Sequence, residues 1–536
     1  MLYIGQQQRR AELSVPALRA GVDVLEGAGG DVELRREAVR LLQLGLSDMG
    51  PSKGRAAMFD GYAPRVSPDV IERELNPLLG RLFGLLPTGD EDLDRELIRF
   101  LAMTAPLNHE LLTQLLGDLT AESSPQEDIH RLVAISRIEL ERSYAETEKA
   151  ARGLLMIDHK LRRLGMKQDT NWDDRMGELY AALCRVDPAL PSVLPQQPEF
   201  GLSGHVLYLS QSPEAVIPQA ISGFLRYLEG DAGGEWTNDV VFVLGESPDP
   251  AHRALLRGQL ENLSVRDAVL IVLAEHPLKE DRVAFVRGLE SVQLNAVDAC
   301  LKALAKLPRT REPGELWVLL GAARRLMNDK REYGLRENAM RLLQNNTEQT
   351  LGFVFGESGY RPQPEALQAW QRWLEQRYPE FRPADQSEEA RMLLESLAEI
   401  MWEGGDAERG RKLFERLGCA KCHGGRRSLG PDLTGVSKRF SREDLFAAIV
   451  EPNRDIPARY QMTSVETVDG RVISGLIVYE SVDGLLLRDA EHRTWRIEST
   501  EVASRYLQRN SLMPSGLLRG VRREDIADLY RYLQAM

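Results

Sequence analysis

The sequence predicts a mainly α protein in which a long array of helical repeats precedes a smaller helical domain with a small β insert. In residues 1–378, apolar side chains recur at helical spacing between short Pro, Gly and Asp breaks, with almost no β alternation. Helical patterns return after residue 404, where a short Cys and His motif occurs. Residues 461–506 are instead rich in Val, Ile, Thr and Leu, which favours strands.

The clearest part of the array shows paired helices with a period of about 30 residues. The expected helices span residues 252–263, 264–275, 281–292 and 294–307. This pattern predicts a HEAT-like α-solenoid over residues 1–385, irregular towards its N-terminal end. Such arrays bury apolar faces against neighbouring repeats and leave a long concave surface for a partner.

The array offers no catalytic constellation in its sequence. Its six histidines are scattered rather than paired at metal-ligand spacing: His109, His130, His159, His205, His252 and His276. Cys184 and Cys300 fall on apolar helical stripes, which predicts buried core thiols. We therefore assign no catalytic residues to this region.

Cys419-Ala420-Lys421-Cys422-His423 is a C-x-x-C-H motif, typical of the attachment site of a c-type haem. Two thiols three positions apart on a helical turn meet the two vinyl groups of one porphyrin, and the adjacent imidazole then lies over the iron. The motif predicts one covalent haem c per chain, bound through Cys419 and Cys422, with His423 as the proximal iron ligand.

Two other interpretations of the cysteine pair were weighed. A redox dithiol uses C-x-x-C, but it follows a strand in a βαβ unit, whereas residues 406–417 here have an amphipathic helical pattern. Structural zinc needs four ligands and usually a second pair of Cys or His residues, and the remaining cysteines lie far upstream. The sequence favours haem over both.

Six segments, in this order, resemble the haem-binding c-type cytochrome domain common in planctomycetes and related bacteria. They are residues 410–414 (GRKLF), 419–423 (CAKCH), 430–434 (GPDLT), 451–453 (EPN), 469–470 (DG) and 511–514 (SLMP). The resemblance implies a class I cytochrome c-like domain over residues 404–536. We expect a linker helix at residues 386–403 before it. It also implies covalent haem c and electron transfer. In many relatives such a domain is fused to a dehydrogenase-like propeller and to helical repeats.

The same resemblance assigns roles to individual residues. The carbonyl of Pro431 is expected to accept a hydrogen bond from the second imidazole nitrogen of His423, which fixes its tautomer. The first and last helices of such domains cross at a glycine with aromatic residues around it, and Gly410, Phe414 and Tyr532 match those positions. Asp406 is a plausible N-cap of the first helix.

The sixth iron ligand has four candidates after the motif: Met462, Met513, Met536 and His492. Met513 is favoured because it precedes Pro514 in a loop before the last helix, where class I cytochromes present their distal thioether. Met462 falls at the start of an expected strand, and Met536 ends the chain, where fraying is common. Ligation by His423 and Met513 would raise the reduction potential and favour electron transfer.

The β insert at residues 461–506 is expected to contain four or five short strands. Asp469-Gly470 and Asp483-Gly484 mark expected hairpin turns. We interpret the insert as a packing element that covers one haem edge.

Charge and composition limit the partners. Residues 406–536 carry 22 Lys and Arg against 19 Asp and Glu, and because the whole chain carries −13, residues 1–405 carry −16. The negative charge of the array argues against nucleic acid or an anionic membrane as its ligand. The sequence contains no run of about 18 apolar residues, so we expect no membrane span. Haem c is attached outside the bacterial cytoplasm, so we expect a periplasmic or exported protein. No signal peptide is visible, which suggests an incomplete N-terminus.

The sequence thus predicts an electron carrier whose helical repeats serve as a docking scaffold for a redox partner protein or an upstream dehydrogenase domain. One alternative is a haem enzyme or gas sensor with an open sixth coordination site. Another is an interaction scaffold whose haem is structural.

Overall fold

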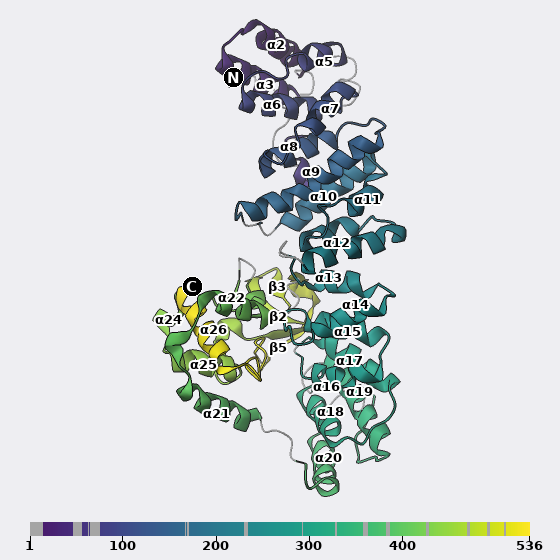
Figure 1. Ribbon diagram of the computed structural model, residues 1–536, viewed down its shortest axis with the longest axis vertical. Helices are drawn as coiled ribbons and strands as arrows, with labels where there is room; N and C mark the ends of the chain where they lie inside the picture. The colour runs from purple at the N-terminus through teal and green to yellow at the C-terminus, as the bar shows by residue number, and fades with distance from the viewer. Residues whose placement is uncertain are drawn as a thin grey trace. The chain divides into compact units, whose positions relative to one another are not determined.

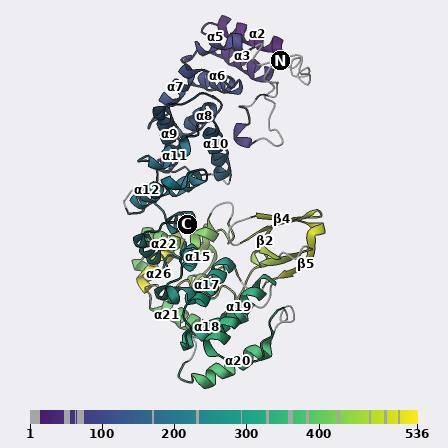
Figure 2. The ribbon, with the colours of Figure 1, turned by 90° about the vertical axis from the view of Figure 1, so that its right-hand side faces the viewer.

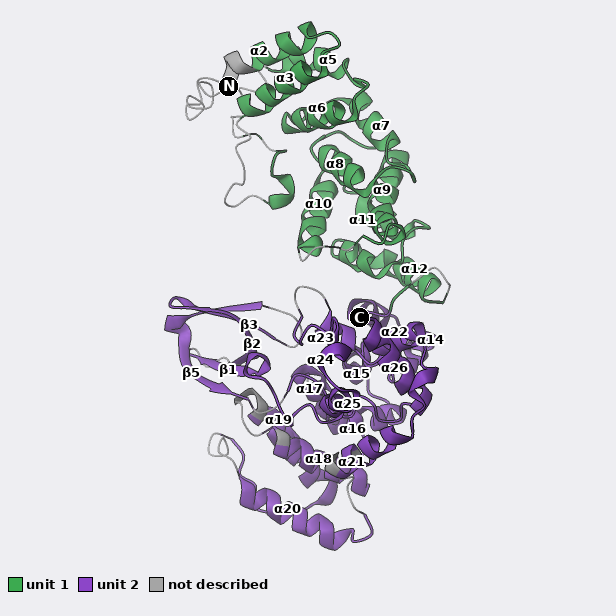
Figure 3. Cartoon of the chain, turned by 90° about the vertical axis from the view of Figure 1, so that its left-hand side faces the viewer, with its two compact units in different colours: residues 1–235 green, residues 236–536 purple. Residues whose placement is uncertain are grey.

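The computed structural model describes residues 14–46, 56–62, 64, 75–166, 168, 171–229, 234–291, 293–326, 330–356, 363–381, 386–424, 428–468, 472–489, 494–508 and 511–536. The chain divides into two compact units, residues 1–235 and residues 236–536, which Figure 3 shows in separate colours. The predicted fold class is confirmed, because the protein is mainly α with one small antiparallel sheet.

Helices make up the described part of the first unit (Figure 1). They are α2 (Ser14–Gly27), α3 (Val32–Gly45), α5 (Asn76–Phe83), α6 (Glu91–Met103), α7 (His109–Gly117), α8 (Pro125–Ile135), α9 (Tyr144–Arg163), α10 (Trp172–Val186), α11 (Leu190–Val193) and α12 (Ile217–Glu229). Polar caps set several starts: the Ser143 side chain accepts the backbone N–H of Glu146, and the Glu146 carboxylate accepts that of Ser143. Lys160 and Asp128 form a buried ion pair between α9 and α8.

Nine α-helices of the second unit lie before residue 400 in the described chain. They are α13 (Asn238–Gly245), α14 (Pro250–Gly258), α15 (Arg266–Glu275), α16 (Arg282–Gly288), α17 (Leu294–Lys306), α18 (Pro313–Arg325), α19 (Lys330–Thr347), α20 (Pro364–Arg377) and α21 (Gln386–Ser396). Helix α15 packs between α13 and α17, and α17 also packs against α19. Cys300 lies at this packing core, where a side chain at Gly288 would clash with its sulfur.

The four helices expected at residues 252–307 correspond to α14, α15, α16 and α17, but α14, α15 and α16 are shorter than expected, and a turn separates α14 from α15. Within it, the side-chain oxygen of Asn262 accepts the backbone N–H of Ser264. Such a side-chain bond offers the backbone an alternative to helix. In this turn, Leu263 contacts the C-terminal helical core.

The C-terminal part of the second unit contains five helices and a sheet among its described residues (Figure 2). The helices are α22 (Ala407–Arg416), α23 (Cys419–His423), α24 (Val436–Arg439), α25 (Arg442–Val450) and α26 (Arg523–Ala535). Asp406 caps α22 as expected, its carboxylate accepting the N–H of Arg409. Leu397 and Ile400, which follow α21, are buried in the same core as α22, α25 and α26.

Helices α22 and α26 cross at Gly410, as the resemblance implied. A Cβ at this position would lie 2.0 Å from the carbonyl oxygen of Asp528. Phe414 and Tyr532 pack beside the crossing with ring centroids 5.3 Å apart. The missing side chain therefore lets the two backbones approach.

We expect Gly410→Ala to destabilise this domain by about 1–3 kcal/mol, because the helices must separate or distort. The free energy of unfolding, measured by urea denaturation, checks the expectation. Gly404→Ala is the matched control, since a Cβ there meets no atom within 4 Å. Equal stability of the two variants would contradict the role given to the crossing.

An ion pair reinforces the same crossing. The guanidinium of Arg409 donates two hydrogen bonds to the Asp528 carboxylate, at 2.7 and 2.8 Å, and the backbone N–H of Asp406 donates a third at 2.6 Å. Burial alone would raise the pKa of Asp528, but these donors hold the pKa below its usual value.

This depressed pKa gives the domain a defined sensitivity to acid. The carboxylate's contribution to stability is present above its unfolded pKa of about 3.9 and is lost as the pH falls through the lower folded pKa. We expect Asp528→Asn to lower stability at neutral pH and to lose less stability than the wild type between about pH 5 and pH 1. Urea denaturation across this range tests it, with Glu524→Gln on the exposed face of α26 as the control. Parallel pH profiles for Asp528→Asn and the wild type would contradict it.

The β insert is a five-stranded antiparallel sheet of order β4-β3-β2-β1-β5. Its strands are β1 (Thr463–Thr467), β2 (Val472–Ser481), β3 (Gly484–Arg488), β4 (Thr494–Glu498) and β5 (Val502–Leu507). One face buries an apolar core of Val465, Ile473, Leu485, Leu487 and Ile497. The hairpin expected at Asp483-Gly484 joins β2 to β3, whereas Asp469-Gly470 lies outside the described residues.

Candidate functional site

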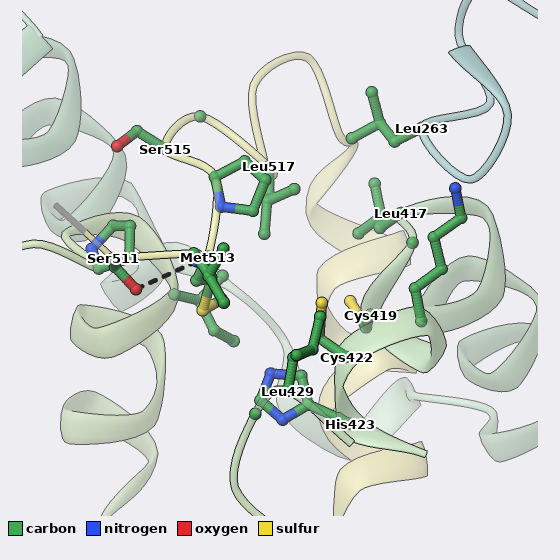
Figure 4. Close-up of a pocket in the computed structure, with 18 of the residues that line it drawn as sticks. Leu263, Leu417, Cys419, Cys422, His423, Leu429, Ser511, Met513, Ser515 and Leu517 are labelled. Atoms are coloured by element: carbon green, nitrogen blue, oxygen red, sulfur yellow. Dashed lines mark hydrogen bonds between the residues drawn. The ribbon is translucent and has the colours of Figure 1, made fainter. Parts of the chain in front are cut away.

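The two motif cysteines lie on one short helix beside a large cavity. Gly418 precedes α23 with φ of +73°, a left-handed conformation that glycine adopts without strain, and it turns the chain from α22 into α23. One helical turn then places Cys419 and Cys422 on the same side (Figure 4). Both sulfurs are free of disulfide bonds and line the cavity.

The imidazole of His423 is held by the segment that follows the motif. Its Nδ1 lies 2.9 Å from the carbonyl oxygen of Pro431, as the resemblance implied. Because a carbonyl only accepts, Nδ1 carries the proton and Nε2 keeps its lone pair. A Cβ on Gly430 would lie 2.6 Å from Cε1 of His423, and the Gly430 N–H donates to the carbonyl of Cys422 at 2.8 Å. The segment thus orients the ring and leaves Nε2 available to a metal.

Replacing Gly430 should loosen this arrangement. In Gly430→Ala the new methyl group must displace the ring and weaken its bond to Pro431. Loss of such a supporting contact weakens a metal ligand by about 10–100-fold. We expect acid to displace His423 from haem iron at a pH higher by about one unit or more, read from loss of the low-spin spectrum. An unchanged acid midpoint, equal to that of Gly404→Ala, would contradict this.

Met513 lines the same cavity as His423, from the loop before α26 (Figure 4). Its N–H donates to the Ser511 hydroxyl at 3.1 Å, and the Ser511 N–H donates to the side chain of Asn453 at 2.7 Å. These bonds tie the loop to the segment after α25. Within the described chain, neither Met462 nor Met536 lines this cavity, and His492 lies outside the described residues.

The electrostatics of the motif do not suit a reactive dithiol. Burial raises the pKa of Cys419 to about 12 and also raises that of Cys422. Redox-active thiols instead have lowered pKa values. Burial lowers the pKa of His423 despite the opposing bond to Pro431, so its imidazole is neutral and able to ligate. Among the described residues, no three or more His, Cys, Asp or Glu side chains form a group that could hold a metal ion by themselves.

Haem c fits these residues. Paired sulfurs, an oriented imidazole with a free Nε2 and a thioether all face one cavity of about 2430 Å³. Apolar side chains such as Leu429, Leu433 and Leu517 line it, as a porphyrin requires. The β insert contributes Ile473 and Trp495, in keeping with its expected role as a cover.

The comparisons with known proteins agree with this site. Residues 407–470 match the family model described as Cytochrome c, a span that runs from α22 through β1 and contains the motif and Pro431. A comparison with curated proteins found no match. The family match supports a c-type cytochrome domain in this part of the chain. None of the helices in the described chain has the length and apolar character to cross a membrane.

Sequence reasoning missed one wall of the cavity. Residues of the helical array also line it, among them Leu263, Arg266, Asp267 and Ile271. These array residues precede the motif by about 150 residues in the sequence. Ser264 and Glu415, which are joined by a hydrogen bond, are likewise 151 residues apart. In the sequence, these residues fit the helical pattern of the array, which accounts for them by packing between helices. No local signal therefore indicated that they also line the cavity.

Proposed function

We propose that the protein carries single electrons through one haem c, ligated by His423 and Met513, and that its helical array docks a redox partner. The observation that carries this proposal is the meeting of the Cys419–His423 helix with the Met513 loop across one cavity. Filling both axial positions excludes exogenous ligands from the iron and favours electron transfer.

The chain's own residues would divide the work. Cys419 and Cys422 anchor the porphyrin, so that haem is retained through every redox cycle. Pro431 holds the proton on Nδ1 of His423 and strengthens its Nε2 as a donor. Ser511 and Asn453 hold the loop that presents the Met513 thioether. When bound, haem supplies a one-electron couple between ferric and ferrous iron.

The proposal extends to organisation and location. It assigns residues 1–385 to a HEAT-like repeat region, residues 386–403 to a linker helix and residues 404–536 to a planctomycete-type cytochrome c domain. The partner would be a redox protein or an associated dehydrogenase domain, met in the periplasm or outside the cell. The acidic array and the mildly basic C-terminal domain support a weak, electrostatically steered encounter.

Spectroelectrochemical titration of the haem-loaded, full-length protein tests the function. We expect one wave of one electron per chain, and no binding of carbon monoxide by the ferrous protein. Ready binding of carbon monoxide by the wild type would instead support the alternative with an open sixth site. The absence of a reversible wave would support a structural haem.

A further inference from the structure

The helical array contacts the C-terminal domain beside Cys419. Leu263, in the turn between α14 and α15, packs against the domain's apolar core, which includes Leu417, and its carbonyl oxygen lies 3.6 Å from where a Cβ on Gly418 would be. The Ser264 hydroxyl donates a hydrogen bond to the carbonyl of Glu415, at the end of α22. Figure 4 shows Leu263 directly beyond Leu417 and Cys419. The turn therefore packs against the connection between α22 and α23.

A second contact joins the array to the opposite wall of the cavity. Glu290, after α16, lies 3.7 Å from the guanidinium of Arg519. Arg519 follows the Met513 loop along the chain and lines the cavity with it. Both side chains are about half exposed, so this pair contributes little energy. It does, however, place the array against the wall that carries Met513 as well as the wall that carries the cysteines.

Charge also connects the turn to the motif. Asp267, at the start of α15, lies in the wall of the cavity that Lys421 also lines, so opposite charges of the array and the motif face one cavity. Lys421 stands between the two cysteines in the sequence and lines the same cavity.

We propose that the turn formed by residues 261–267 is part of the haem site and covers the haem edge that is bonded to Cys419. The proposal rests on the proposed function, since it requires a covalent haem. Three observations support it: Leu263 packs against the apolar core of the C-terminal domain, Ser264 donates a hydrogen bond to Glu415, and residues of the array line the cavity.

The cover has two consequences. It excludes water from one haem edge, and a drier haem favours the ferrous state, whose iron and porphyrin carry less net charge. It also removes that edge from the surface that a partner protein can reach. Electrons would then enter and leave by another part of the haem domain, and the array would tune the potential in addition to any docking role.

Single substitutions in the full-length, haem-loaded protein test the cover. Leu263→Ser should let water reach the edge. We expect the ferric-to-ferrous ratio at a fixed ambient potential to rise about threefold, which is a lowering of the reduction potential by about 28 mV for a one-electron couple. Reduction by a small reagent such as ascorbate should also be faster than the lowered reduction potential alone would give. Ser264→Gly should shift both readouts in the same direction by less.

Leu255→Ser is the matched control, because Leu255 is exposed on α14 and does not line the cavity. An unchanged potential and an unchanged rate in Leu263→Ser, with haem fully attached, would overturn the cover while leaving the electron-transfer proposal intact. Failure of the wild type to bind haem covalently would instead overturn the proposed function itself.

Discussion

Replacing Cys419 and Cys422 together by Ala should abolish covalent haem. We propose that each sulfur forms one thioether bond to a haem vinyl group, and both sulfurs lie on one turn of α23 beside the cavity. The wild type, produced with a haem-maturation system and exported, should keep its haem through denaturing electrophoresis. The double variant should show no haem-stained band.

The upstream cysteines provide the control for this experiment. Cys184 and Cys300 are buried in helical packing, so Cys184→Ala combined with Cys300→Ala should leave the haem stain unchanged. A haem-stained band that persists in the Cys419 and Cys422 variant would show that attachment takes place elsewhere.

Met513→Ala should convert a six-coordinate, low-spin iron to one with an open axial position. Met513 lines the cavity, and hydrogen bonds to the Ser511 hydroxyl and to Asn453 hold its loop in place. The ferric wild type should show the absorption band of a thioether–iron bond, and the variant should lose this band and bind carbon monoxide readily. Optical titration with carbon monoxide measures the difference.

Met462→Ala is the comparison for that variant. Met462 stands immediately before β1, and its carbonyl accepts the N–H of Gln508 near the edge of the sheet. We expect its band and its inertness to carbon monoxide to match those of the wild type. Retention of the band in Met513→Ala, with its loss in Met462→Ala, would move the axial ligand to the insert.

The local geometry of the candidate site was predictable because short segments of the sequence, in a fixed order, determine it. The spacing of Cys419, Cys422 and His423 fits one helical turn, and that turn is α23. The Pro431 contact followed from the resemblance of its segment to a known motif, and the structure contains it. The helix crossing at Gly410 was predictable for the same reason.

The long-range part of the site was not predictable in this way. Leu263 occupies an apolar position at the end of an expected helix, and repeat packing accounts for it without a second role. Its contact with the C-terminal core depends on how the chain returns after α21, which no residue pattern specifies. The exact end of α14 was missed because the helix stops at Gly258 and hydrogen-bonded turns follow it up to Asn262.

The crossing of α22 and α26 bears on the order of events during biogenesis. Arg409 and Asp528, which join these helices, are 119 residues apart. At about 5–20 residues per second, a ribosome needs about 6–24 s to add that stretch. The first helix and the cysteines are therefore made before their partner helix, and α22 cannot pack at Gly410 until α26 is present. Closure of the domain is thus a late event in its folding, and only then does Cys419 lie against a packed core.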